Sequence, residues 1–158
     1  LNKEKQIVKG KGRVSFKLKG GGSIRSQYYG RNSSIKIKVP KSVKSRALYA
    51  FKLRDKYGFK GGIETGWKRA KQLATKESIP IQDVKFMRAW FARHIKTSYP
   101  SYKSWKEKGS PKEDKYWKNK HGIIAYLIWG GTPAYNWINS SSVRNKLKKY
   151  YDRDFKKV

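Results

Sequence analysis

The feature that most constrains this chain is the spacing of its apolar residues between Pro40 and Ile138. Apolar and aromatic side chains recur there at intervals of three and four, as in SVKSRALYAF and DVKFMRAWFARH, while Lys or Arg fills most of the gaps. Such spacing predicts amphipathic α-helices, because residues three and four apart share one helix face. The same segment must therefore form a core and present a cationic surface.

The charge of the chain indicates an anionic partner. Its 158 residues include 40 Lys and Arg against ten Asp and Glu, a formal net charge of +30. The excess is spread out, with about +10 in residues 1–40, about +15 in 41–140 and about +5 in 141–158. A charge of this size repels itself within a compact state and attracts polyanions. Because aromatic residues make up 15% of the chain, we expect a folded protein.

Length and pattern predict one mainly α domain preceded by a basic arm. Residues 14–18 and 35–39 alternate apolar and polar or basic positions, which is typical of short strands with one buried face. We therefore expect an extended arm of some β character at 1–39 and a compact domain of about five short helices at 40–158. A two-stranded ribbon is marginal alone, so the arm needs the helical domain or a neighbouring molecule.

The helical pattern of the domain has recognisable ends. Ser42 is placed to cap the first helix, and Gly58 or the pair Gly61-Gly62 ends it. The three serines at 140–142 are placed to cap the last helix. Helical pattern also covers residues 65–74, 83–95, 122–129, 133–137 and 143–155. The core is predicted to contain Val43, Ala47, Phe51, Trp67, Leu73, Val84, Met87, Trp90, Phe91, Ile124, Leu127, Ile128, Trp129 and Trp137, with Phe86 widening the face formed by 84–95.

A long loop rich in Lys and aromatic residues is predicted at about 97–120. Periodicity disappears there, and Pro100, Gly109 and Pro111 punctuate the segment. Loops of this length are usually functional or mobile.

Basic residues interleaved with Tyr and Trp are what binders of single-stranded nucleic acid use, with cations along the phosphates and rings stacked on bases. The alternative, that the rings pack the loop onto the domain and the lysines are solvated, is equally open, because no known nucleic-acid-binding module is recognisable. The candidate anion- or partner-binding residues are Lys9, Lys11, Arg13, Lys17, Lys19, Arg25, Arg31, Lys103, Trp105, Lys106, Lys112, Tyr116, Trp117, Lys118, Arg144 and Lys148.

Catalysis has little support in the sequence. Glu64, Asp83 and His94 are the acid–base candidates of the organised region and are far apart along the chain. Neither they nor His121 form a recognisable metal-binding set, and the chain has no cysteine. No nucleophile elbow or phosphate loop of known pattern occurs. We expect no enzymatic activity, cofactor, metal or small-molecule substrate.

Several sequence segments, taken in their order along the chain, resemble a known viral domain. They are RALYAFKLRDKYGFKGG, GWKRAKQLA, MRAWFARH and IAYLIWGGTPAYNW, and together they span about 100 residues. The set resembles a small helical domain found in tailed-phage proteins of the head region and in large DNA viruses of algae. The chain departs from the phage pattern in its basic arm and its longer loop at 97–120, which favours the large-virus context.

The resemblance implies a minor capsid protein of a chlorovirus-like large DNA virus, and it supplies no catalytic residues. The expected function is that of a cement protein on the inner side of the capsid shell, which binds major and other minor capsid proteins through the arm and the loop. Its cationic face would meet acidic capsid surfaces, anionic headgroups of an inner membrane or the viral DNA. The alternative is a packaged protein that condenses DNA without sequence specificity.

Overall fold

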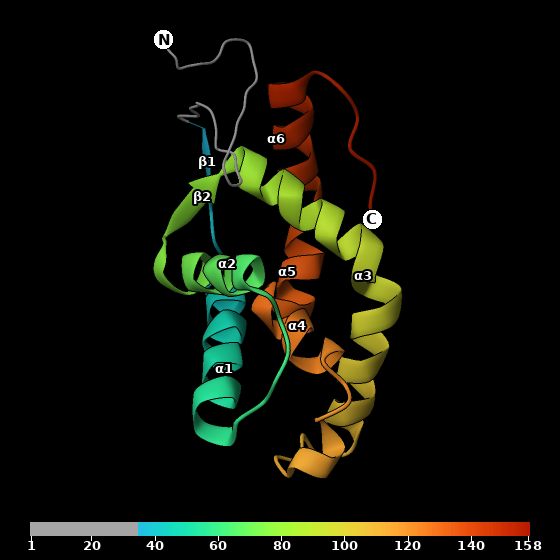
Figure 1. Cartoon of the computed structure of the whole chain (residues 1–158). Helices are drawn as coiled ribbons and strands as arrows, with labels where there is room; N and C mark the ends of the chain where they lie inside the picture. Colours follow the sequence, from blue (N-terminus) through green and yellow to red (C-terminus); the bar gives the residue numbers. More distant parts are fainter. Residues whose placement is uncertain (1–34) are drawn as a thin grey trace. The chain divides into compact units, whose positions relative to one another are not determined.

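The computed structural model describes residues 35–158, which are mainly helical, and this confirms the predicted fold class (Figure 1). Six α-helices, two short strands and one 3₁₀ turn follow one another along this part of the chain. The chain divides into two compact units. One, here called the helical body, comprises Ile37–Ile79 and Asp83–Val158. The described residues of the other unit are 35–36 and Pro80–Gln82.

The two strands, β1 (Lys36–Lys38) and β2 (Ser78–Pro80), form a small antiparallel sheet. Ile37 and Val39 are buried while the two lysines of β1 are exposed, which confirms the predicted alternation over 36–39; Ile35, expected on the same apolar face, is 45% exposed. The partner strand lies between the second and third helices, where three residues are too few to show a period in the sequence. The strand predicted at 14–18 lies outside the described residues.

The first helix, α1 (Lys41–Tyr57), ends at Gly58, one of the two predicted ends. Its N-cap is Pro40, so the predicted cap at Ser42 is wrong. The reason is that the Pro40 carbonyl already accepts hydrogen bonds from the amides of Val43 and Lys44, both at 3.1 Å. The helix therefore begins before Ser42 can act as its cap.

The second helix, α2 (Glu64–Thr75), begins within one residue of the predicted start and packs against α1. The connection before it contains Gly62, whose φ is +79°. A Cβ at Gly62 would lie 2.4 Å from Cδ1 of Ile128 and 2.9 Å from Nε1 of Trp67. No side chain fits where this connection passes against the core, which explains the glycine pair more fully than a turn does.

The third helix is far longer than predicted. α3 (Ile81–Glu107) contains Pro100 in its interior, so the prediction of a loop from residue 97 is wrong as far as residue 107. A proline removes one backbone hydrogen bond and bends a helix, and Figure 1 shows α3 changing direction along its length. The helix continues because Ser98, Tyr102 and Trp105 are buried and share one face at i, i+4 and i+7.

The remainder of the predicted loop, residues 108–121, contains one 3₁₀ turn, η1 (Asp114–Tyr116). Two short helices follow, α4 (Gly122–Ile128) and α5 (Gly131–Ile138). Between them Gly130 has a φ of +100°, and a Cβ there would lie 2.5 Å from Cβ of Ala134 and 2.9 Å from Cγ1 of Val43. Only glycine fits this tight passage between helices.

The last helix, α6 (Ser141–Tyr151), is capped by Ser140, the first of the three serines predicted to cap it. The Ser140 side chain accepts a hydrogen bond from the Val143 amide at 3.3 Å. The helix ends at Asp152, earlier than the predicted residue 155, and the chain continues as a non-helical tail. The Asn139 side chain holds this tail, since its Oδ1 accepts from the Val158 amide at 2.8 Å.

The core contains most of the predicted residues, but its composition differs in two ways. Phe51, Trp67 and Trp137 are only half-buried, and Phe86, expected to widen the α3 face, is 50% exposed. Side chains that were not predicted to be buried complete the core, and several of them come from the predicted loop or from segments predicted to be turns. These unpredicted core residues include Leu53, Phe59, Ile79, Tyr102, Trp105, Trp117, Ile123, Tyr126, Ile138, Val143 and Leu147.

Candidate anion-binding surface

Two tryptophans among the candidate binding residues lie in the core. Trp105 and Trp117 are only 2% and 6% exposed. The Trp117 ring stacks on Phe59 with centroids 4.6 Å apart, and the Trp105 ring meets the edge of Phe59 at 5.7 Å. Their faces are therefore covered by protein, which favours the packing alternative for both tryptophans.

The same tryptophans fix the connection that follows α3. Nε1 of Trp105 donates to the Pro111 carbonyl at 2.8 Å, and Nε1 of Trp117 donates to the Lys112 carbonyl at 3.0 Å. A buried indole N–H needs such a partner, because leaving it unpaired costs free energy. The predicted loop thus supplies acceptors that anchor it to the helical body.

Lys112 also belongs to this anchor. Its ammonium donates to the Ser110 carbonyl at 2.7 Å and lies 5.5 Å from the ring centroids of both Tyr57 and Trp105. A cation at this distance from aromatic rings is attracted by their quadrupoles. We therefore assign Lys112 mainly to packing of the connection rather than to contact with a partner.

The remaining candidates of this segment are at the surface. Lys103 and Lys106 lie on α3, and Tyr116 and Lys118 lie in the connection; all four are exposed. The hydrogen bond from Trp105 on α3 to the Pro111 carbonyl places this connection against the C-terminal end of α3, where Figure 1 shows the two segments together. Lys103, Lys106 and Lys118 are called the α3-end lysines from here on.

The two candidates on α6 are partly engaged. Nε of Arg144 donates to the Asn139 carbonyl at 2.9 Å, and its side chain is half-buried. The Lys148 ammonium forms an ion pair with Asp154 at 3.1 Å, with both side chains mostly exposed. An exposed pair of this kind contributes little to stability and leaves Lys148 available to a stronger anion. The other candidates, Lys9, Lys11, Arg13, Lys17, Lys19, Arg25 and Arg31, lie outside the described residues.

A second group of cations was only partly anticipated from the sequence. Lys85 and Arg88 from α3, Arg144 from α6 and Arg153 from the tail form what we call the C-terminal cationic cluster. Aromatic rings connect its members: Lys85 lies 4.6 Å from the Tyr151 ring, and Arg153 and Arg88 lie 4.1 and 5.7 Å from the Phe155 ring. The two rings are themselves 5.7 Å apart.

Arg88 is the buried centre of this cluster, with 5% of its surface exposed. Its guanidinium donates to the carbonyls of Ile138 and Lys156, from α5 and from the tail. Arg144 joins the group because it binds the carbonyl of Asn139, the neighbour of Ile138. Arg88 therefore ties α3 to the C-terminal segments through neutral acceptors alone.

Within residues 35–158, no carboxylate forms an ion pair with any member of the cluster. Burial lowers the pKa of the Arg88 guanidinium, and the charges of Arg144 and Arg153 lower it further. Burial also lowers the pKa of the Lys85 ammonium, with Arg153 as the second cause. The four cations therefore repel one another without internal compensation.

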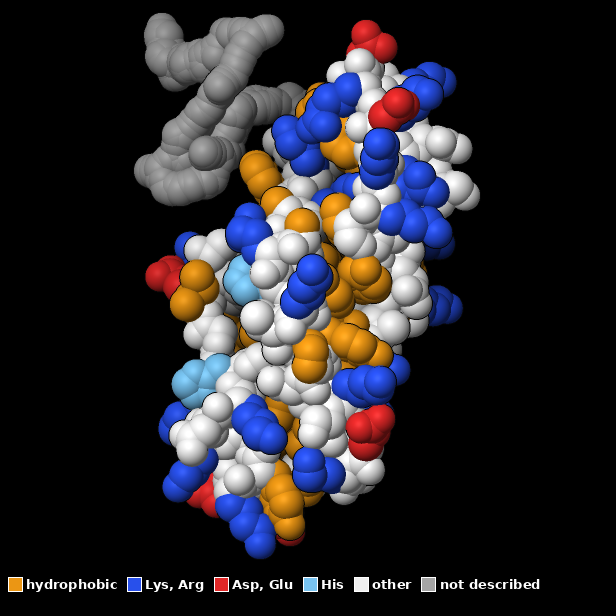
Figure 2. Space-filling view, turned by 90° about the vertical axis from the view of Figure 1, so that its right-hand side faces the viewer, with side chains coloured by type: hydrophobic (Ala, Val, Ile, Leu, Met, Phe, Trp, Pro, Cys, Tyr) orange, Lys and Arg blue, Asp and Glu red, His pale blue; other side chains and the backbone are white. Residues whose placement is uncertain are grey.

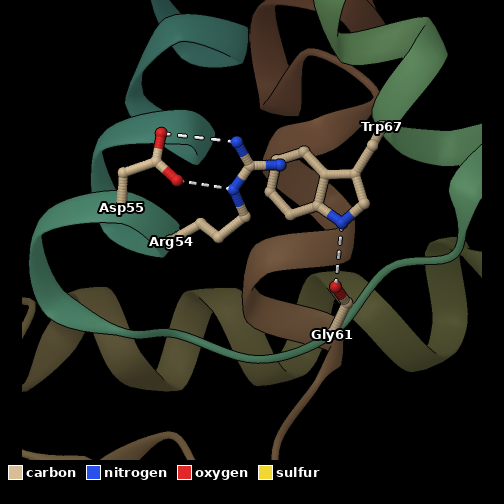
Figure 3. Close-up of polar contacts among 4 residues, drawn as sticks. All are labelled: Arg54, Asp55, Gly61 and Trp67. Atoms are coloured by element: carbon tan, nitrogen blue, oxygen red, sulfur yellow. Dashed lines mark hydrogen bonds and ion pairs between the residues drawn. The ribbon is translucent and has the colours of Figure 1, made fainter.

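Arg54 on α1 shows the opposite arrangement, in which the charge is compensated (Figure 3). Its guanidinium binds Asp55 at 2.7 and 3.3 Å and lies 4.4 Å from the Trp67 ring. The Arg54 hydrogen bond lowers the pKa of Asp55. Nε1 of Trp67 donates to the Gly61 carbonyl at 3.2 Å, so this ring is held by the connection and covered by Arg54.

The acid–base candidates each have a structural contact. Asp83 lies 3.6 Å from Nη1 of Arg69 and accepts from Nε2 of Gln72 at 2.7 Å, which links α3 to α2. Glu64 pairs with Lys68 one helical turn later, at 3.3 Å and with both side chains largely exposed. Both carboxylates therefore have a cationic or amide partner within the helical body.

The two histidines are likewise separate from the carboxylates. His94 stacks on Trp90 with ring centroids 4.7 Å apart, and its Nδ1 lies 2.9 Å from the Trp90 carbonyl oxygen. His121 is exposed at the N-cap of α4. In the described part of the chain, no three His, Asp or Glu side chains are grouped so that they could hold a metal ion.

Helices of the described residues are also too short or too polar to cross a membrane. Lysine and arginine dominate the charged side chains of the face in Figure 2, with few acidic groups between them. Comparison with protein-family models, with curated proteins and with solved structures found no match to this chain.

Proposed function

We propose that this protein is a minor structural protein of a large icosahedral virus, which lies on the inner side of the capsid shell and cements neighbouring capsid proteins. One observation carries the proposal. The burial of Trp105 and Trp117 packs the segment predicted as a loop onto the helical body, so packing sets the backbone positions of the α3-end lysines, whose side chains are exposed. Lysines on a surface where the tryptophan faces are covered, beside the 37% exposed Tyr116, suit adhesion to an acidic protein surface better than stacking on a run of bases.

The composition of the surface supports a protein partner. The described residues carry 31 Lys and Arg against nine Asp and Glu. Large apolar side chains also reach the surface, with Leu48 55% and Ile63 74% exposed. Protein interfaces combine apolar anchors with a polar rim, and complementary charge directs their encounter. Lysine supplies three quarters of the basic residues, and as a hydrated point charge it suits general electrostatic contact.

Zero-length carbodiimide cross-linking in purified virus particles tests this function. The reagent joins lysine ammonium groups to carboxylates in direct contact, so we expect the α3-end lysines to be linked to Asp or Glu of capsid proteins. The exposed Lys52 and Lys71, on α1 and α2, provide an internal comparison. Absence of the protein from particles, or links confined to residues of this chain itself, would contradict the cement function.

A second function, packaged DNA binding, is favoured by a different observation. The C-terminal cationic cluster has no carboxylate partner among the described residues, whereas Arg54 and Arg69 elsewhere in the body do. An uncompensated group of cations attracts a polyanion such as DNA. Binding to duplex DNA with a steep inverse dependence on salt would support this function, and binding that is insensitive to salt would contradict it.

A further inference from the structure

We propose that the C-terminal cationic cluster binds the phosphodiester backbone of duplex DNA. The inference goes beyond the capsid contact and deepens the second proposed function, on which it rests. It assigns a site to Lys85, Arg144 and Arg153, with the buried Arg88 behind them as a fixed positive charge.

The arrangement of the cluster carries an electrostatic cost. Lys85, Arg88 and Arg153 lie around the rings of Tyr151 and Phe155, with the shortest cation-to-ring distance 4.1 Å for Arg153, and Arg144 is held nearby by the Asn139 carbonyl. Holding like charges together, with all but Arg153 partly or fully buried, opposes folding, and a single opposite charge would relieve it. No described carboxylate does so. A bound anion would therefore supply the missing opposite charge.

The acidic residues of the neighbouring segments do not supply this opposite charge. Asp83 on α3 is paired with Arg69, and Asp154 in the tail is paired with Lys148. Asp152, next to Arg153 in the chain, is exposed and forms no ion pair among the described residues. One solvated carboxylate at the edge leaves the cluster with a net positive charge.

The side chains of the cluster favour a phosphodiester as the bound anion. Arginine supplies three of the four cations, although lysine outnumbers it threefold in the whole chain. The planar guanidinium matches the two free oxygens of a phosphodiester. Lys148, one helical turn after Arg144 on the same face of α6, continues the positive charge, and its ion pair with Asp154 is largely exposed. A row of cations suits an extended polymer better than a single small anion.

The aromatic rings of the cluster favour duplex over single-stranded nucleic acid. Binders of single strands offer free ring faces on which bases stack. In this cluster the Tyr151 and Phe155 rings are partly buried and are approached by Lys85, Arg88 and Arg153. Contacts to phosphates without contacts to bases give binding that does not depend on sequence.

The test compares two double variants of the full chain. K85Q/R153Q removes two cluster cations that donate no side-chain hydrogen bond among the described residues, and K52Q/K71Q removes two exposed cations of α1 and α2. The binding of each to a fluorescent 30-base-pair duplex is measured as a function of salt concentration. Thermal unfolding by circular dichroism checks that both remain folded, and the single variant R153Q replaces K85Q/R153Q if that protein does not fold.

We expect K85Q/R153Q to reduce the slope of log K against log salt by about 2, because each lost phosphate contact removes roughly 0.9 from it. For the single variant R153Q the expected reduction is about 1. The control K52Q/K71Q should change the slope by less than half as much as the matching cluster variant. Equal effects of the cluster and control variants would overturn the assigned site while leaving DNA binding as a function. Failure of the unmodified protein to bind duplex DNA would overturn both.

Anionic lipid vesicles provide the remaining comparison. If the cluster variant lost binding to phosphatidylserine vesicles but kept the DNA affinity of the unmodified protein, the site would belong to a membrane surface and the proposal would be wrong. Cross-linking of the α3-end lysines to capsid proteins is independent of all these outcomes, so failure of the cement function is recognised separately.

Discussion

Replacing Trp117 by Ala tests whether the aromatic residues of the predicted loop serve the core or a partner. The ring is 6% exposed, stacks on Phe59 and donates a hydrogen bond to the Lys112 carbonyl. Removing a buried Trp side chain costs about 3 to 5 kcal/mol of unfolding free energy. In a domain of this size that loss lowers the melting temperature by roughly 10 to 20 °C.

Two matched variants separate the contributions. Trp117→Phe keeps a ring against Phe59 but loses the indole N–H, so we expect a cost of about 1 to 2 kcal/mol. Tyr116→Ala changes the adjacent exposed ring and should cost about 0.5 kcal/mol or less. Urea unfolding followed by circular dichroism measures all three. If the free energy of unfolding of Trp117→Ala lay within about 1 kcal/mol of that of the unmodified protein, and the variant lost nucleic-acid binding, the assignment of Trp117 to the core would be refuted.

Three further predictions follow from the same packing. Gly130→Ala should destabilise the body by about 2 kcal/mol or more in urea unfolding, because its φ of +100° and the contact with Ala134 both disfavour a Cβ; a neutral effect would contradict the tight passage. Arg88→Met should free the tail, so that trypsin cleaves at Lys156 sooner than in the unmodified protein; unchanged cleavage would contradict the Arg88 anchor. Burial raises the pKa of Tyr126 to about 12, above its ordinary value near 10. The unfolded state therefore loses this proton first, and stability that is complete below pH 10 should fall by up to about 1.4 kcal/mol per pH unit between pH 10 and 12. Tyr126→Phe should reduce this alkaline loss, and an equally steep loss in that variant would contradict the assignment.

The helical architecture could be predicted because local rules and burial agree along most of the domain. Val43, Ala47 and Leu73 lie on faces with regular spacing, and all three are buried. The Ser140 cap was also predictable, since its hydroxyl acts on the helix that follows directly. In these segments the sequence pattern alone contains the decisive information.

The segment after residue 97 could not be predicted in the same way. Pro100 normally marks a helix end, but the burial of Tyr102 and Trp105 outweighs the one backbone hydrogen bond that it removes. Their partners, among them Phe59 and Tyr126, lie far away in the sequence. Tertiary packing of this kind leaves no signal in the local sequence. For that reason the sequence alone does not distinguish aromatic residues of a loop from those of the core.

The candidate site was predictable in composition and not in arrangement. Arg144 was identified as a binding residue from the charge of α6, while Lys85, Arg88 and Arg153 were not. What unites them is the tail, which brings Phe155 and Arg153 back beside α3. The helical periodicity of α3 and α6 does not predict that the tail folds back against α3. The useful sequence signal would have been an arginine, Arg88, on the buried face of a helix.

The position of the protein in an assembled particle tests the central claim most directly. A density map of the purified virus, at a resolution that shows side chains, would reveal what the α3-end lysines contact. The cement function predicts the helical body beneath the shell, with Lys103, Lys106 and Lys118 against acidic residues of capsid proteins and more than about 1,000 Å² buried in that interface. A particle that lacks the protein, or one in which these lysines face solvent, would contradict it.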